Sequence, residues 1–314
     1  MAHLDFEKPL VELESRIREL RSVADGDATI DAQIAELEAR ASTLQQDLLG
    51  DLGVWEKVQL SRHPERPYFL DYLERIFDDV LELHGDRVFG DDPALIAGFA
   101  RLDGESVCVV GHQKGRSTKQ KQHRNFGMAH PEGYRKAQRV MELAGRYGRP
   151  VMTFIDTPGA YPGLGAEERG QSEAIGASIL CMAELPVPVI ATVIGEGGSG
   201  GALALGVAER VLMLQYATYS VITPEGCASI LWRDGARGPE AAEQLRLLAR
   251  DAQRLGIVDT IVGEPVGGAH RDAGDAARRL GAALRRELAE LRSWSVSERL
   301  DRRYARFRGI GKHA

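Results

Sequence analysis

The sequence predicts an α/β fold preceded by an N-terminal helical hairpin, and two glycine-rich turns are the main evidence for the sheet. The apolar run at residues 187–194 leads into the glycine-rich stretch at 195–206 and then into small residues that favour helix. A second apolar run, at residues 151–156, leads in the same way into the turn at 156–170. Strand, turn and helix therefore alternate twice, as they do in α/β proteins.

The first 60 residues predict the helical hairpin. Apolar residues recur at steps of three and four on both sides of a breaker at residues 25–27. The repeating residues are Leu10, Leu13, Ile17, Leu20 and Ala24 before the breaker, and Ile30, Ile34, Leu37, Ala41, Leu44 and Leu48 after it. A two-helix hairpin buries little surface by itself. Residues 1–60 are therefore predicted to pack on a partner, and residues 61–314 to form the main domain.

The main domain is predicted to begin with the break in the helical pattern at residues 61–67. A helix is expected over residues 68–83, with Leu70, Leu73, Phe77 and Val80 on one face, and a β-hairpin over 95–110 around the turn dipeptide Asp103-Gly104. The later elements are a helix at 132–147, a strand at 151–156, a helix at 167–185, a strand at 187–194, a helix after Gly200, strands at 211–214 and 219–222, a helix at 239–255, a strand at 257–262 and a helix at 272–293.

The composition is typical of a soluble globular protein. The chain has 314 residues, of which 43% are hydrophobic and 27% charged, which suffices for one large core or two modest ones. The net charge of −6 argues against a general nucleic-acid binder. Cys108, Cys181 and Cys227 lie far apart and form no metal-ligand pattern, so no metal site is predicted. No signal-like or membrane-spanning run is present, and we expect a cytoplasmic protein without a membrane partner.

The stretch at residues 195–206 fits two familiar patterns as well as a purely structural role. Gly195, Gly197 and Gly200 match the dinucleotide-binding pattern, but the following strand-like run ends at Gln215-Tyr216 without the acidic residue that this pattern needs. A glycine turn that merely packs a helix against a sheet also remains open.

A serine-hydrolase turn is the other pattern. Gly197, Ser199 and Gly201 match it, and His270 could approach the serine, although the paired glycines after the serine are more than such a turn requires. Glycines without Cβ atoms leave peptide N–H groups open to a ligand. The stretch therefore favours a turn that binds an oxyanion, and the second glycine turn at residues 156–170 would complete its pocket.

Seven strings resemble the carboxyltransferase alpha-subunit family of bacterial acetyl-coenzyme A carboxylase. They are GHQKGR at 111–116, RNFGM at 124–128, PEGYRKA at 131–137, FIDTPGAYPG at 154–163, AEERGQSEAI at 166–175, VIGEGGSGGALA at 193–204 and SVITPEGCASILW at 220–232. The resemblance covers nearly the whole chain. It implies a crotonase-type (ClpP/crotonase-like) fold, in which β-β-α units wind into a spiral and peptide N–H groups form oxyanion holes.

The resemblance also implies an activity and partners. The family transfers a carboxyl group from carboxybiotin, held on the biotin carboxyl carrier protein, to acetyl-coenzyme A, and the malonyl-coenzyme A formed serves fatty acid biosynthesis. It implies an α2β2 pairing with a beta subunit, within a larger ATP-dependent assembly that includes biotin carboxylase. No covalent cofactor is implied for this chain, and zinc is expected only on the beta subunit.

The site residues follow from the two turns and from a basic segment at residues 114–124. The family places the enolate of the thioester mainly on the beta subunit and the biotin oxyanion on the alpha subunit, and it needs no protein base. The predicted oxyanion donors are Gly200 and Gly201, with Gly159 and Ala160; the predicted substrate-binding residues are Gly197 and Gly198, with Lys114, Arg116, Lys119 and Lys121 for the phosphates of coenzyme A.

Three alternatives stay open at this point. The basic segment has a simpler interpretation as a solvated loop. A stand-alone crotonase-fold hydratase, isomerase or hydrolase is the rival enzyme class. For the residues before 61, a scaffold that only holds partners is the rival role.

Overall fold

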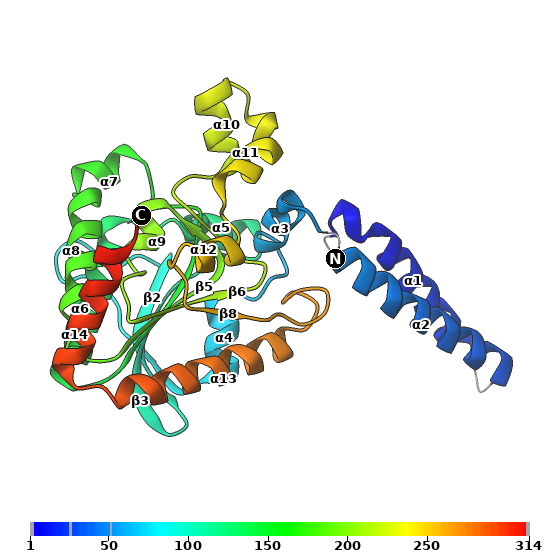
Figure 1. Cartoon of the computed structure of the whole chain (residues 1–314), viewed down its shortest axis with the longest axis horizontal. Coiled ribbons are helices and arrows are strands. Elements are labelled where there is room, and N and C mark those ends of the chain that lie inside the picture. Colours follow the sequence, from blue (N-terminus) through cyan, green and yellow to red (C-terminus); the bar gives the residue numbers. More distant parts are fainter. Residues whose placement is uncertain (1–2, 25–26, 51, 312–314) are drawn as a thin grey trace.

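The computed structural model describes residues 3–24, 27–50 and 52–311, and it has the predicted mixed α/β architecture. A twisted sheet forms the centre of the body, and the hairpin α1–α2 projects away from it (Figure 1). The helices are α1 (Lys8–Val23), α2 (Ala28–Gly50), α3 (Val54–Ser61), α4 (Phe69–Ile76), α5 (Thr118–His123), α6 (Pro131–Arg146), α7 (Leu164–Glu168), α8 (Gln171–Glu184), α9 (Ser199–Leu203), α10 (Pro224–Trp232), α11 (Gly238–Leu245), α12 (Ala249–Arg254), α13 (Ala273–Arg292) and α14 (Val296–Gly309).

The sheet has eight strands in the order β1-β2-β3-β4-β5-β6-β8, with β7 paired to the end of β5. They are β1 (Asp78–Glu82), β2 (Leu95–Leu102), β3 (Glu105–His112), β4 (Val151–Thr157), β5 (Val189–Gly198), β6 (Arg210–Leu214), β7 (Thr218–Ser220) and β8 (Thr260–Val262). The first three strands are antiparallel and the rest run parallel. Helices α6, α8 and α14 lie side by side along one flank, and α13 packs on α4 (Figure 1).

Several predicted elements are confirmed. The strands expected at 151–156 and 187–194 are β4 and β5, and both are buried along almost their whole length, as strands covered on two faces must be. The β-hairpin turns at Asp103 and Gly104, whose φ angles of 51° and 83° suit the tight two-residue turn that this dipeptide favours.

The helix predicted over residues 68–83 is wrong in its second half. Helix α4 ends at Ile76, and Asp78–Glu82 pairs with β2 as an edge strand instead. Leu70 and Val80 are exposed, whereas Phe77 is buried. Residues 78–82 form backbone hydrogen bonds with the edge of β2, and the two aspartates at 78 and 79 are poor helix formers. Strand pairing therefore outweighs the helical periodicity of the apolar residues.

Two other predicted helices are interrupted. The segment 167–185 is divided by Gly170, whose φ of 80° ends α7 and starts α8. The segment 239–255 is divided at Arg246, which takes a φ of 51°. The break directs the Leu247 side chain towards Val58 and Ala242, with which it forms a small apolar cluster. Burial of this leucine favours ending the helix here.

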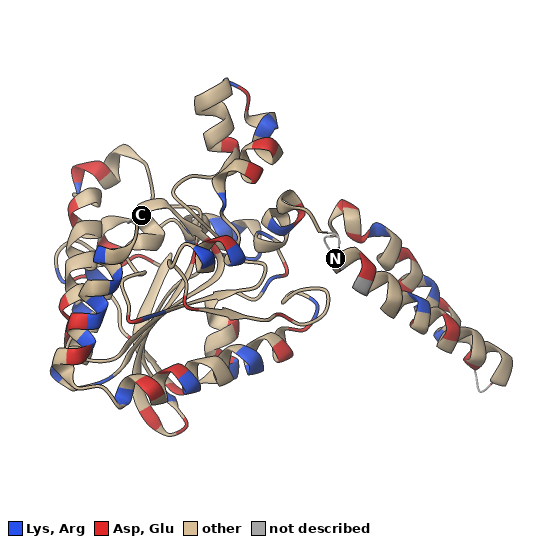
Figure 2. Cartoon of the chain, viewed as in Figure 1, with Lys and Arg blue, Asp and Glu red and all other residues tan. Residues whose placement is uncertain are grey.

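The predicted hairpin periodicity is confirmed. Every apolar residue expected on the seam is buried or half-buried, with Leu10, Ile17 and Ile34 the most enclosed. Residues 25 and 26 of the expected breaker lie outside the described residues. Acidic and basic residues are interspersed along both helices of the hairpin (Figure 2), which is typical of helices with solvated faces.

The segment at residues 61–67 connects the helical N-terminal part to the sheet. Arg66 lies within it and is 1% exposed. Its guanidinium donates to both carboxylate oxygens of Glu264, at 2.9 and 2.6 Å, and to the Ile194 carbonyl oxygen at 2.8 Å. The same carboxylate accepts the amides of Tyr216 and Ala269. Every charge in this buried pair is therefore hydrogen-bonded, as a charge inside a protein must be.

We predict that Arg66→Met lowers the free energy of unfolding by about 3–5 kcal/mol, because it leaves the Glu264 carboxylate buried without a counter-charge. The double variant Arg66→Met/Glu264→Gln removes that charge and should be less destabilised than the single variant. Urea denaturation measures both. Arg21→Met, which breaks the exposed Arg21–Glu38 pair, is the control and should have little effect. A double variant that is worse than Arg66→Met would contradict the prediction.

Candidate active site

The two glycine turns lie in direct contact at one edge of the sheet. β4 and β5 are parallel neighbours, and Thr157 pairs with Gly197 where the strands end. A Cβ atom on Gly201 would lie 2.6 Å from the Ala160 nitrogen, and one on Gly198 would lie 2.2 Å from the Pro158 carbonyl oxygen. Only glycine at these two positions lets the turns approach so closely.

The contact leaves peptide donors without protein acceptors. Within the described residues, the Ala160 N–H makes no hydrogen bond to the protein. Gly200 and Gly201 lie in the first turn of α9, where N–H groups have no acceptor within the helix. The Thr157 hydroxyl fixes the other turn, since it donates to the Gly159 carbonyl oxygen at 2.6 Å and accepts the Gly159 N–H at 3.1 Å. The Gly159 N–H is therefore occupied, and the prediction of Gly159 as an oxyanion donor is wrong. The four predicted oxyanion residues lie together, and the role of the other three stays a prediction.

Ser199 does not have the surroundings of a hydrolase nucleophile. Its side chain is exposed and makes no hydrogen bond within the described part of the chain. The ring of His270 is instead bonded to Glu7. Ser199 does have a φ of 55°, which the sequence did not predict, whereas the φ of Gly201 lies outside the left-handed range. Gly201 is required because it contacts Ala160, not because of its backbone conformation.

Lys114 is not the mobile surface cation that the basic segment suggested. Its ammonium group lies 2.7 Å from an Asp156 oxygen and 2.8 Å from a Glu196 oxygen, and its side chain is 13% exposed. Burial by itself would lower the pKa of Lys114, but the two carboxylates outweigh burial and raise it. Neither partner was predicted from the sequence, because both lie at the ends of β4 and β5, far from Lys114 in the chain.

The rest of the basic segment divides into a fixed part and an exposed part. Arg116 is bonded to Asp71 and the Pro64 carbonyl oxygen, and its guanidinium lies 4.7 Å from the centre of the Tyr68 ring. Lys119 and Lys121 lie on the short helix α5, where they form no ion pair with any described residue. Of the four predicted cations, these two remain the candidates for binding phosphate.

A cleft opens beside the turns. It has a larger and a smaller part, and Arg62, Pro158 and Glu196 line both of them. The predicted substrate-binding residues Gly197 and Gly198 line the smaller part, while Lys114 and Lys121 line the larger. The cleft therefore joins the glycine turns to the basic segment.

The turn at residues 124–128 has a conformation that was not predicted from the sequence. Asn125 and Phe126 both have positive φ angles, 48° and 56°, and the Phe126 ring is 49% exposed in the larger part of the cleft. Non-glycine residues in this conformation are strained and are often found at functional sites. The match of residues 124–128 to the family motif did not indicate the strained backbone of Asn125 and Phe126.

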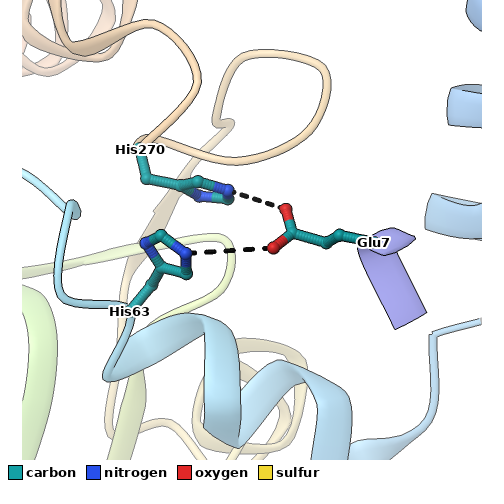
Figure 3. A group of neighbouring side chains, drawn as sticks. All are labelled: Glu7, His63 and His270. Atoms are coloured by element: carbon teal, nitrogen blue, oxygen red, sulfur yellow. Dashed lines mark hydrogen bonds and ion pairs between the residues drawn. The ribbon is translucent and has the colours of Figure 1, made fainter. Parts of the chain in front are cut away.

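One group of described residues has the composition of a metal site. Glu7, His63 and His270 bring one ligand atom each to within 4.8 Å of one another (Figure 3). The Glu65 amide donates to Nδ1 of His63, which places the ring proton on the nitrogen that faces Glu7. The two rings also stack, with centroids 4.0 Å apart, and a nitrogen of each lies beside a different oxygen of the Glu7 carboxylate. The geometry fits a carboxylate that binds two imidazoles better than it fits a metal.

Glu7 thereby joins the start of the hairpin to the body. Its Oε1 lies 2.9 Å from Nε2 of His270. Burial alone would raise the pKa of Glu7, but the hydrogen bonds from His270 and the Leu4 amide and the charge of Arg271 lower it from 4.5 to about 2. Arg271 also pairs with Glu14 of α1, so the hairpin contacts the same loop twice.

The chain matches the family model described as acetyl co-enzyme A carboxylase carboxyltransferase-like over residues 3–311. A relative from Geobacter metallireducens, described as acetyl-coenzyme A carboxylase carboxyl transferase subunit alpha, is 53% identical over 311 residues, which are 99% of this chain and 98% of the relative. A relative from Sorangium cellulosum with the same description is 57% identical over 308 residues, which are 98% of this chain and 97% of the relative.

Two solved structures share the fold. Transcarboxylase 12S, with methylmalonyl-coenzyme A and methylmalonic acid bound, has a TM-score of 0.56 at 24% identity, over 71% of this chain and 42% of its own. The beta subunit of Pseudomonas aeruginosa geranyl-CoA carboxylase has a TM-score of 0.57 at 18% identity, over 86% of this chain and 55% of its own. This chain thus spans less than two thirds of either solved chain. The likeness confirms the predicted crotonase-like fold.

We predict that Glu7→Gln destabilises the protein by about 2–3 kcal/mol at pH 6 and by progressively less as the pH falls from 4.5 towards 2. The folded state holds Glu7 at a lower pKa than the unfolded chain, so its contribution is present above pH 4.5 and is lost on acidification. Urea titrations of both proteins from pH 6 to pH 3 measure the difference. The exposed Glu12→Gln on α1 is the control. A difference that does not change with pH would count against the ion pair.

Proposed function

Because the chain belongs to the acetyl-coenzyme A carboxylase carboxyltransferase family, we propose that it is the alpha component of a carboxyltransferase that converts acetyl-coenzyme A into malonyl-coenzyme A. The observation that carries this function is the contact between the two glycine turns, which brings the Ala160 N–H beside the first turn of α9. Preorganised peptide donors of this kind stabilise an oxyanion without reorganising during the reaction.

The turns fit the carboxyl donor that the family uses. The biotin of a carrier protein supplies an activated carboxyl group, and its ureido oxygen becomes negatively charged when that group leaves. In this chain the Ala160 and Gly200 N–H groups would donate to that oxygen, and the ring would approach through the part of the cleft that Gly197 and Gly198 line. The phosphates of acetyl-coenzyme A would be drawn by Lys119 and Lys121 of α5.

The rival acyl-coenzyme A hydratase or hydrolase needs an acid or base at the turns. Glu196 is the carboxylate that lines both parts of the cleft, but Lys114 and Arg62 bind it. Burial alone would raise its pKa, and these two cations outweigh burial and lower it. A carboxylate held in its charged form by two cations is a poor general acid or base at neutral pH. This observation favours the carboxyltransferase.

The proposal extends to partners and location. One pair of turns suits one oxyanion, so the thioester enolate is assigned to a beta subunit in an α2β2 complex. The biotin carrier protein and biotin carboxylase complete the ATP-dependent assembly in the cytoplasm, where its product serves fatty acid biosynthesis. Zinc is assigned to the beta subunit and no covalent cofactor to this chain. No helix in the described ranges has the length and apolar character needed to cross a membrane.

We predict that the isolated chain has no carboxyltransferase activity and that activity appears when the beta subunit is added, because the second anion needs donors from another chain. Malonyl-coenzyme A formation from carboxybiotin and acetyl-coenzyme A measures it. Beta subunit alone is the matched control. Full turnover by this chain alone, or turnover of an enoyl-coenzyme A, would instead support the rival enzyme.

We predict that Gly201→Ala lowers kcat of the complex by about 100-fold or more, whereas Gly200→Ala has a much smaller effect. A Cβ at Gly201 would meet the backbone of the other turn, but one at Gly200 would meet only Ile175, at 3.5 Å. Ser199→Gly should retain activity, since glycine suits a φ of 55° and the hydroxyl has no role. Circular dichroism and beta-subunit binding must show that each variant folds. An inactive Ser199→Gly beside an active Gly201→Ala would overturn the assignment.

A further inference from the structure

We propose that Lys114 is a positioning residue: together with Asp156, Glu196 and Arg62 it sets the position of one glycine turn relative to the other, and it does not bind substrate phosphate. The proposal rests on the proposed function only in taking these turns as the reacting site. It changes the role of Lys114 from the one that the basic segment suggested. Its physical basis is a continuous chain of hydrogen-bonded charges at the ends of β4 and β5.

Asp156 connects the two strand ends. It is the penultimate residue of β4 and is 1% exposed. Its Oδ1 accepts the Lys114 ammonium at 2.7 Å and the Glu196 N–H at 3.0 Å. The carboxylate also packs against bare backbone, since a Cβ on Gly195 would lie 2.4 Å from the same oxygen. The side chain of β4 therefore holds the backbone of β5 immediately before Gly197.

Glu196 extends the connection outward. Its carboxylate lies between the Lys114 ammonium, at 2.8 Å, and the Arg62 guanidinium, at 2.7 Å. Arg62 also binds Glu225 in the first turn of α10, at 2.6 Å. Two cations and three carboxylates thus alternate, and removing one cation leaves a carboxylate in the partly buried cleft without compensation.

Lys114 has little capacity left for a substrate. An ammonium group has three N–H donors, and two of them are taken by Asp156 and Glu196. Its side chain is 13% exposed, whereas Lys119 in the same segment is exposed and unpaired within the described residues. A shift of Glu196 would move Gly197 and the following residues to Gly201 directly, because they are continuous in the chain. Misplacing catalytic donors by about 1 Å can cost about 100-fold in rate.

The test uses the complex with the beta subunit and compares Lys114→Met with Lys119→Met. Lys114→Met should lower kcat by about 10- to 100-fold while KM for acetyl-coenzyme A changes less than about threefold. Lys119→Met should act on KM and on its salt dependence. The double variant Lys114→Met/Asp156→Asn, which removes the carboxylate charge left unpaired, should recover part of the lost kcat. A Lys114→Met enzyme with raised KM and normal kcat would overturn the proposal and make Lys114 a phosphate ligand.

Hydrogen exchange separates failure of this proposal from failure of the proposed function. Lys114→Met should speed exchange of the amides at residues 196–201, and Lys119→Met should leave them at the wild-type rate. This readout holds whatever reaction the complex catalyses. If Lys114→Met does not fold, Lys114→Arg and Glu196→Gln take its place in the same comparison. Unchanged exchange at residues 196–201 in a folded variant would overturn the proposal even if the complex is an active carboxyltransferase.

Discussion

The buried contact of Arg66 with Glu264 and the Ile194 carbonyl oxygen is the interaction on which the candidate site depends. Ile194 lies in β5, immediately before the stretch that carries the glycine turn. Two other residues of the segment 61–67 contact different parts of the protein. Arg62 binds Glu196 beside the turn, and His63 lies beside Glu7 of the N-terminal part. Residues 61–67 thus connect the hairpin, the sheet and the cleft through one loop.

A buried ion pair adds little net stability, but it disfavours every other arrangement that would leave its charges buried and unpaired. Bringing Arg66 and Glu264 out of water costs free energy, and only complete hydrogen bonding offsets that cost. Here the guanidinium uses both carboxylate oxygens and one carbonyl, while the carboxylate also accepts two amides. Any arrangement of β5 that moved Ile194 away would leave these groups unsatisfied. The pair therefore selects the backbone position from which the glycine turn starts.

The sequence was most informative where chemistry is local. Glycine-rich stretches after apolar runs predicted both turns. The seam of the hairpin followed from the spacing of apolar residues, and the turn at Asp103-Gly104 from the dipeptide itself. It failed where residues distant in the chain decide the outcome. The partners of Lys114 come from two later strands, so a cation bound to two carboxylates was predicted to bind phosphate. Pairing with the edge of β2 similarly makes residues 78–82, which were expected to end a helix, the strand β1.

The separation of these partners along the chain has a consequence for synthesis. Glu7 and His270 are 263 positions apart, and Arg66 and Glu264 are 198 apart. A ribosome makes the hairpin long before it makes the loop at residues 263–271 that anchors it. Contacts of such long range are slow to form. A nascent chain released before residue 264 would carry Arg66 without its acceptor, and such fragments would be recognised as unfinished by chaperones and proteases instead of competing for the partner subunit.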